Sequence, residues 1–265
     1  MSTLTLDPQR GAFDAADSAR STLLFGVAIQ VALLAPSLLA YGLDERLING
    51  VSVWSKPVKF QLSLSLLLLT VVWLLPLLPP ARRASRRVRR ASLAIATAAT
   101  LEIAYITLQA ARGRASHYNA DTPIETTLYA VMGVGATTIV AGAFVVGVAI
   151  WRTAPEPGRA GLRLGAAIGL TLGAVLTLIT AGILSNGGEA GHWVGASRTD
   201  AGGLPLFGWS RTVGDLRVPH FFATHIMQAL PLLGLAADRF APRRARAAVW
   251  AGAGLSVLVV AATFV

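Results

Sequence analysis

The sequence predicts an all-α fold, a polytopic membrane bundle of seven transmembrane helices. Of the 265 residues, 54% are hydrophobic and only 14% are charged, and the mean hydropathy is +0.60. Soluble globular domains do not have this composition. The charged residues also divide the chain into seven long apolar stretches, each close to the ~20 residues that a helix needs to cross a bilayer.

The apolar stretches have the length and pattern of helices. Transmembrane strands are about 10 residues long and alternate in polarity, whereas these stretches are longer runs of Leu, Ala, Val and Gly. A helix also satisfies its own backbone hydrogen bonds within lipid. The expected helices cover residues 21–43, 60–81, 91–111, 126–151, 164–188, 218–237 and 247–265.

Residues 1–20 are expected to form a cytoplasmic segment ahead of the bundle. They carry Asp7, Asp14 and Asp17 and precede a long apolar run. A cleaved signal peptide has a basic start and a shorter apolar core, so we expect the first helix to remain as an anchor. Residues 21–265 show no internal repeat and no long linker. They are therefore expected to form a single transmembrane domain, with assembly into a homo-oligomer left open.

The arginines set the expected orientation. The connections around residues 82–90, 152–163 and 239–246 hold most of the 23 Lys and Arg residues, on the same side as the N-terminus. The positive-inside rule then places the N-terminus in the cytoplasm and the C-terminus outside, in a cell membrane of bacterial type. The net charge of +10 needs no nucleic acid, because the run ARRASRRVRR is explained by orientation against anionic lipid. The lipid bilayer is the expected partner.

Small residues recur every fourth position along the fifth expected helix. Small side chains on one face let two helix backbones approach closely, which is how helices associate in lipid. The stripe therefore predicts a packing seam, and a ligand channel along it is the alternative. Its members are Gly161, Gly165, Gly169, Gly173, Thr177, Ala181 and Ser185.

The longest connection, residues 186–217, lies on the outer side and is rich in Gly and Trp. A loop of this length in a compact bundle is uncommon and is often functional. We expect it to fold over the outer mouth of the bundle. His192 within it is expected to be exposed to water, and Asp215 and Arg217 to form the turn into the sixth helix.

Ionisable groups inside the spans give the strongest functional signal, because each is costly to place in a membrane. Glu102 lies near the middle of the third helix. Tyr105, Gln109 and Arg112 follow at spacings of three, four and three residues, which puts all four side chains on one helix face. The pattern predicts a polar stripe from mid-membrane to the outer surface.

Two further helices bring polar faces in from the outer side. Lys56 and Lys59 open the second helix, and His225 and Gln228 share a face of the sixth, ahead of a helix-bending Pro231. If these faces point inward, they line one cavity that opens outward and ends near Glu102. Other interpretations stay open: Glu102 pairs with an Arg or Tyr, His225 donates to a carbonyl freed by Pro231, and the lysines reach the interface.

Recognisable catalytic signatures are mostly missing from the sequence. There is no HExxH motif, no P-loop and no nucleophile elbow, and the last helix has no lysine for a retinal Schiff base. Zero cysteine excludes thiolate metal sites and covalently attached haem. All four histidines, however, lie on the outer side, and imidazole is the commonest neutral nitrogen ligand of metals.

Three function classes remain. The leading expectation is a bound divalent metal or haem b for redox or hydrolytic chemistry, with Glu102 and His225 as catalytic residues. His225, His117 and His220 would be the metal ligands, although His220 and His225 are five residues apart and face different directions on a helix. The first alternative is a proton-coupled transporter of small molecules that uses Glu102.

The second alternative is a non-catalytic sensor of a lipid or small anion, bound through Lys56, Lys59, Arg112 and Arg114. In each class the partner in the cavity is a small-molecule ligand. The residues expected to contact it are Lys56, Lys59, Tyr105, Gln109, Arg112 and Gln228.

Overall fold

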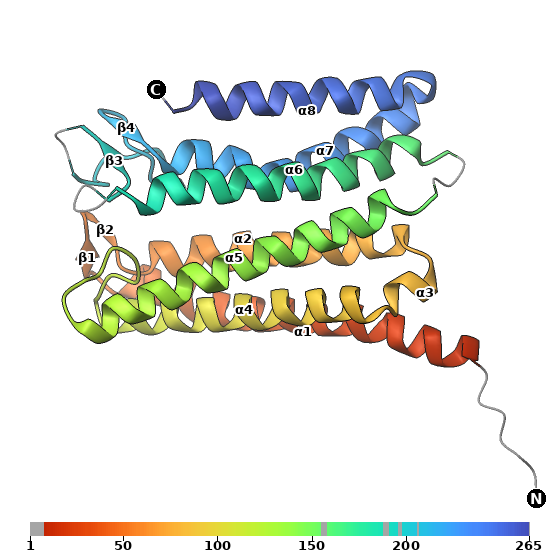
Figure 1. The fold of residues 1–265 in the computed structure, drawn as a ribbon. Helices are drawn as coiled ribbons and strands as arrows, with labels where there is room; N and C mark the ends of the chain where they lie inside the picture. The colour runs from red at the N-terminus through yellow and green to blue at the C-terminus, as the bar shows by residue number, and fades with distance from the viewer. Residues whose placement is uncertain (1–7, 155–157, 188–190, 196–197, 206, 265) are drawn as a thin grey trace, which may run out of the picture.

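The structure, a computed structural model, describes residues 8–154, 158–187, 191–195, 198–205 and 207–264, with side chains from residue 18 onward. Within these residues, seven helices are long and apolar enough to cross a membrane (Figure 1). The predicted all-α bundle is therefore confirmed. The seven are α1 Pro8–Leu43, α2 Ser55–Leu74, α4 Arg86–Ala111, α5 Pro123–Trp151, α6 Ala160–Ser185, α7 Arg217–Phe240 and α8 Ala245–Ala262.

Short elements connect the long helices. Helix α2 ends at Leu74 because Pro76 has no backbone N–H to continue the helical hydrogen bonds. Several connections contain a two-stranded hairpin or a single turn of helix. These short elements are η1 Leu75–Leu77, α3 Pro80–Arg83, η3 Pro242–Arg244, the hairpin of β1 Leu47–Ile48 with β2 Val51–Ser52, and the hairpin of β3 Trp193–Val194 with β4 Gly214–Asp215.

The helices differ from the expected spans at their ends, most of all at the start of α1, which begins at Pro8, and at the end of α2, which stops at Leu74. Helix α2 begins at Ser55, before the expected start at residue 60, and α4 begins at Arg86, before the expected start at residue 91. Long basic side chains are tolerated in the first turns of a transmembrane helix because their charged ends can extend toward the interface. The positions of charges therefore predict where each apolar stretch lies but not where its helix begins.

The bundle has two distinct ends, and the start of α1 and the end of α8 lie at opposite ends (Figure 1). One end carries the connections 44–54, 112–122 and 186–216 together with both hairpins, and we call it the loop end. The other carries the connections 75–85, 152–159 and 241–244, and we call it the arginine end. The end of α8 lies at the loop end, as seven crossings require.

The glycine stripe of the fifth span packs against α7, which confirms the predicted seam. A Cβ added at Gly169 would lie 2.9 Å from Cδ of Pro231, and one at Gly173 would lie 2.7 Å from Cγ of Met227. At Gly161 it would lie 2.6 Å from the Gly234 carbonyl oxygen. Helix α7 continues through Pro231, so α6 and α7 approach along their length at backbone distance.

Apolar side chains fill the inside of the bundle and also cover its outside. Leu68, Ile95 and Ile150 are completely buried, whereas Phe25 and Leu101 are 69% and 66% exposed. A soluble protein would not leave such large apolar side chains along every outer helix. The same surface is expected of helices whose outer faces contact lipid.

Candidate functional site

The carboxylate of Glu102 is the central feature of the candidate site. The residue is 7% exposed, and its Oε2 atom is buried with no hydrogen-bond partner among the described residues. Nine residues separate it from Ala111 at the loop end of α4, which corresponds to about 14 Å along the helix axis. A buried carboxylate with an unpaired oxygen is costly, so a proton or a ligand atom is expected at this position.

Helices α2 and α5 supply the surroundings of this carboxylate. Lys56 of α2 is the opposite charge that acts on Glu102, and its ammonium lies 5.6 Å from the centre of the Phe60 ring. On the α5 side is Gly135, where an added Cβ would lie only 3.7 Å from Oε2. The prediction that the polar faces of the second and third spans point to the same interior is therefore supported for Lys56 and Glu102.

Three glutamines extend the polar interior, and each has a buried side-chain oxygen without a partner. Gln30 on α1 and Gln61 on α2 are completely buried, and Gln228 lies on α7. Their amide nitrogens are bonded across helices, whereas every Oε1 atom is unpaired among the described residues. The bonds made by Nε2 are 3.3 Å from Gln30 to the Ala99 carbonyl, 2.8 Å from Gln61 to Ser37 Oγ and 3.2 Å from Gln228 to Thr70 Oγ1.

Three of the four residues of the predicted stripe on α4, Tyr105, Gln109 and Arg112, are connected by hydrogen bonds, whereas Glu102 is not bonded to them. Gln109 Nε2 donates to the Tyr105 hydroxyl at 3.1 Å, and Arg112 Nη1 donates to Gln109 Oε1 at 2.8 Å. Glu125 and Arg114 form a pair that the sequence did not predict. Arg114 donates to Glu125 through Nε at 2.5 Å and through Nη2 at 2.6 Å. Gln109 Nε2 also donates to Glu125 Oε1 at 3.4 Å, so these residues join α4 to α5 at the loop end.

The three histidines expected to bind a metal lie in separate environments. His117 packs between the rings of Phe60 and Tyr129, with centroids 5.8 and 5.6 Å away. Burial, and then the positive charge of Lys56, lower the pKa of His117 well below its usual value. His117 is therefore a neutral ring at neutral pH.

The other two expected ligands, His220 and His225, lie on α7. His220 Nδ1 is 3.1 Å from Thr180 Oγ1, and His225 Nδ1 donates to the Phe221 carbonyl at 2.8 Å. The second bond is a contact to the helix backbone, but its acceptor is the Phe221 carbonyl and not the carbonyl freed by Pro231 that the sequence left open for His225. Across the described ranges, no group of three or more His, Cys, Asp or Glu side chains is placed to hold a metal ion.

His192 is not the exposed loop residue that the sequence suggested. It is 8% exposed, its Nε2 is 3.1 Å from Asp200 Oδ1, and its ring lies 3.9 Å from that of Trp193. The expectation of exposure was wrong because the connection 186–216 folds back on itself and pairs β3 with β4. That folding removes His192 from water.

Arg217 holds this connection together, so it does more than form the turn into α7. Its guanidinium bonds Asp215 at 2.6 Å and Asp200 at 2.7 Å. Burial raises the pKa of both acids. Hydrogen bonds and the positive charge of Arg217 lower the pKa of both by more than burial raises it, and for Asp200 the hydrogen bond with His192 contributes as well. The pKa of each acid is therefore below its usual value. Both acids are therefore ionised at neutral pH.

The folded connection covers the loop end of α1 and α2, and we call residues 191–195, 198–205 and 207–216 the cap. Asp200 N–H donates to the Asn49 carbonyl at 2.8 Å, and a Cβ added at Gly50 would lie 2.8 Å from Cβ of Ala201. Lys59 Nζ donates to the Phe207 carbonyl at 3.2 Å. The predicted folding of this loop over the mouth is thus supported, and Lys59 serves as one of its contacts.

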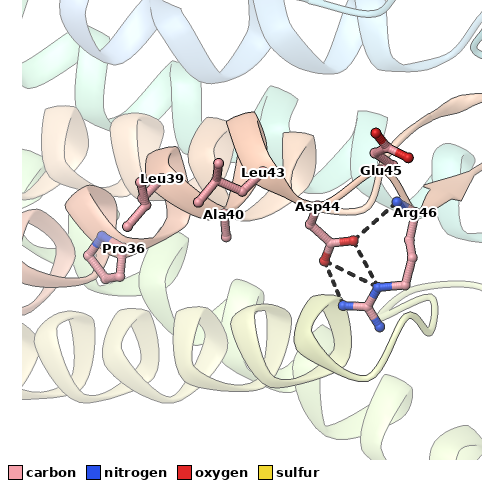
Figure 2. A pocket seen from close by; sticks show the side chains of 7 residues that line it. All are labelled: Pro36, Leu39, Ala40, Leu43, Asp44, Glu45 and Arg46. Atoms are coloured by element: carbon pink, nitrogen blue, oxygen red, sulfur yellow. Dashed lines mark hydrogen bonds and ion pairs between the residues drawn. The ribbon is translucent and has the colours of Figure 1, made fainter.

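Two surface hollows lie away from Glu102. One, of about 670 Å³, follows α1 from Pro36 to Leu43 and ends at Asp44, Glu45 and Arg46. Figure 2 shows Arg46 turned toward Asp44 and Glu45 turned away from the pair. Hydrogen bonds from Arg46 and then from Trp54 hold the pKa of Asp44 far below its usual range, so this end of the hollow is a closed ion pair.

The second hollow, of about 480 Å³, lies at the arginine end between α2, α6 and α7. The candidate site is instead the buried surroundings of the Glu102 carboxylate, and the unpaired amide oxygens of Gln30, Gln61 and Gln228 mark further points of the bundle interior. Lys56 and the neutral His117 lie toward its loop end, beneath the cap. Comparison of the chain with models of known families, with curated proteins and with solved structures finds no match.

Proposed function

We propose that this protein binds a small polar molecule in its interior and exchanges a proton at Glu102, as a proton-coupled membrane transporter does. The observation that carries the proposal is the buried Oε2 atom of Glu102, which has no hydrogen-bond partner among the described residues, and Gln30, Gln61 and Gln228 each add an amide oxygen unpaired in the same sense. Buried polar atoms in proteins are almost always paired. An unpaired carboxylate oxygen in the middle of a span, with unpaired acceptors on three further helices, supports a polar ligand in the interior.

The chemistry of these atoms indicates the class of solute. All four are acceptors, so the solute should carry several O–H or N–H donors. Lys56 is the opposite charge acting on Glu102, which makes the pair close to neutral overall. A neutral or zwitterionic solute rich in donors, such as a polyol, a sugar or an amino acid, fits better than an anion.

Proton coupling follows from the position of Glu102 in the bundle. When protonated, its carboxyl group is neutral and can donate one hydrogen bond; when ionised, it accepts only. Binding of a donor-rich solute would therefore favour the ionised form and release the proton. Intramembrane carboxylates of this kind are typical of proton relays in transporters. If the loop end lies outside, as the arginines predict, the cap covers the side of the bundle from which the solute would enter.

Uptake into proteoliposomes under an imposed pH gradient tests this proposal. We expect pH-driven uptake of at least one labelled solute from a panel of polyols, sugars and neutral amino acids. Glu102→Gln should abolish the pH-driven part, since it preserves shape and removes the titration. Glu45→Gln, which changes an exposed acid outside the site, is the matched control and should keep full uptake. Uptake that is independent of pH, or unchanged by Glu102→Gln, would contradict the proposal.

A bound haem or metal is the second candidate function, and one observation favours it. Because His225 Nδ1 donates to the Phe221 carbonyl, the lone pair lies on Nε2, which is the tautomer of many metal-ligating histidines. The absorption spectrum and metal content of the purified protein test this candidate: a Soret band or stoichiometric metal, lost in His225→Ala, would support it. The anion sensor has weaker support because Lys59, Arg112 and Arg114 already bond protein atoms.

A further inference from the structure

The hollow at the arginine end combines an apolar wall with a basic rim. It lies between α2, α6 and α7, and its volume of about 480 Å³ is in the range of ligand pockets. Trp73, Leu77, Leu162 and Leu235 form the apolar wall. The rim carries the guanidinium-bearing residues Arg159 and Arg239 together with Asp238.

The position of the hollow matches the level of lipid headgroups. Trp73, on the last turn of α2, is 40% exposed, and tryptophan is enriched where a membrane meets water. Leu235 on α7 is 44% exposed and continues the apolar surface toward the middle of the bundle. One edge of the hollow therefore faces the hydrocarbon region and the other faces the headgroups.

The charge at the rim favours an anion. Asp238 is the acid at the rim, and its two oxygens accept from the N–H groups of Gly161 and Leu162, each at 2.7 Å. Its negative charge therefore lies against the first turn of α6, which favours negative charge. Arg239, by contrast, is exposed, and its guanidinium lies 5.6 Å from the centre of the Phe240 ring.

We propose that this hollow binds an anionic phospholipid, with the phosphate against Arg239 and an acyl chain along Trp73 and Leu235. Guanidinium groups match phosphate oxygens in charge and geometry, and basic pockets between transmembrane helices are typical sites for anionic lipid headgroups. Flanking connections strengthen the local field, since residues 79–90 and 241–246 contain nine arginines and no acid: Arg82, Arg83, Arg86, Arg87, Arg89, Arg90, Arg243, Arg244 and Arg246.

Native mass spectrometry of the delipidated full chain, titrated with phosphatidylglycerol or phosphatidylcholine, tests the proposal. Phosphatidylglycerol should bind at least several-fold more tightly than zwitterionic phosphatidylcholine. Arg239→Gln should weaken phosphatidylglycerol binding about five-fold, as expected for the loss of one basic residue near a membrane surface. Arg243→Gln removes an arginine close in sequence but outside the hollow and should have much less effect.

A second variant separates loss of the site from loss of the fold. Leu235→Trp fills the hollow at an exposed position, so it should reduce phosphatidylglycerol binding without lowering thermal stability in detergent. Equal binding of the two lipids, or equal weakening by Arg239→Gln and Arg243→Gln, would overturn the proposal. Competition by millimolar inorganic phosphate as effective as that by lipid would also overturn it, because it would make the site one for a free anion.

Discussion

The Glu102 carboxylate on α4 faces Gly135 on α5, with only 3.7 Å between Oε2 and the position that a Cβ would take at Gly135. A glycine at this point leaves the carboxylate oxygen unpaired within the described residues and keeps open the space beside it. Two consequences follow, one for stability and one for binding. Both can be tested by placing a hydroxyl at Gly135.

Gly135→Ser should stabilise the protein and reduce its activity. A serine hydroxyl at this position can donate to Glu102 Oε2, and one satisfied hydrogen bond contributes about 1 kcal/mol. The same group would occupy the proposed ligand space. Gly133→Ser is the matched control, since nothing lies within 4 Å of a Cβ added there. Thermal unfolding in detergent should show an increase for the first variant that exceeds that of the control; an equal effect would indicate helix propensity alone.

Gly169→Leu should destabilise the α6–α7 seam by about 3 kcal/mol or more, because a side chain there would collide with Pro231 and the Ile226 carbonyl. Ile179→Phe enlarges a side chain on the same helix that is 52% exposed, and it should be nearly neutral. The two melting temperatures in one detergent decide the point. A seam without tight packing would give the two variants similar stabilities.

His117→Phe should remove part of the acid sensitivity of the fold. Burial lowers the pKa of His117 in the folded protein, whereas in the unfolded chain the group titrates near pH 6.5. The unfolded chain therefore binds more protons as the pH falls below about 6.5, so the folded state loses stability there. Phe fits between Phe60 and Tyr129 and cannot titrate. The drop in melting temperature from pH 7.5 to pH 5 should be smaller in the variant; an unchanged drop would assign the sensitivity to other groups.

Asp200→Asn should loosen the cap at neutral pH. The pKa of Asp200 is lowered in the folded state, so its stabilising effect is present above the unfolded value of about 3.9 and is lost as the pH falls below it. The variant removes one of the two charge partners of Arg217 at all pH values and leaves Asp215. Amide hydrogen exchange of residues 207–216 should be faster in Asp200→Asn, by about ten-fold for a loss near 1.4 kcal/mol.

Asp121→Asn is the control for the cap experiment. Asp121 also bonds an arginine, but its side chain is 72% exposed, and such surface pairs contribute little. Exchange in the cap should match the wild type in this variant. If Asp200→Asn also left exchange unchanged, Arg217 and Asp215 alone would hold the cap in place.

The spans, the glycine seam and the stripe on α4 could be predicted because each depends on periodicity along one segment. Charge spacing marks apolar stretches, and steps of three and four residues place Tyr105 and Gln109 above Glu102 on one face. These features need no knowledge of how the helices are arranged. The structure accordingly confirms the seven helices and the α6–α7 contact, and it adds the hydrogen bond between Tyr105 and Gln109 within the stripe.

Features that depend on two distant segments could not be predicted. Gln61 meets Ser37 across α1 and α2, and His192 meets Asp200 within a connection that has no regular period. Gln30 gave one usable signal, since it is an isolated amide in a long apolar span, a position where an unneeded polar group is costly. Its three-dimensional relationship to Glu102 depends on the packing of α1 against α4.

Infrared difference spectroscopy of the Glu102 carboxyl group tests the central claim most directly. Purified protein titrated with acid should gain a protonated carboxyl band that is missing in Glu102→Gln and retained in Glu45→Gln. Addition of a transported polyol, sugar or amino acid at constant pH should then decrease that band as the proton is released. A Glu102 carboxylate that stays ionised over the whole pH range in which the protein is folded, with or without solute, would contradict the account.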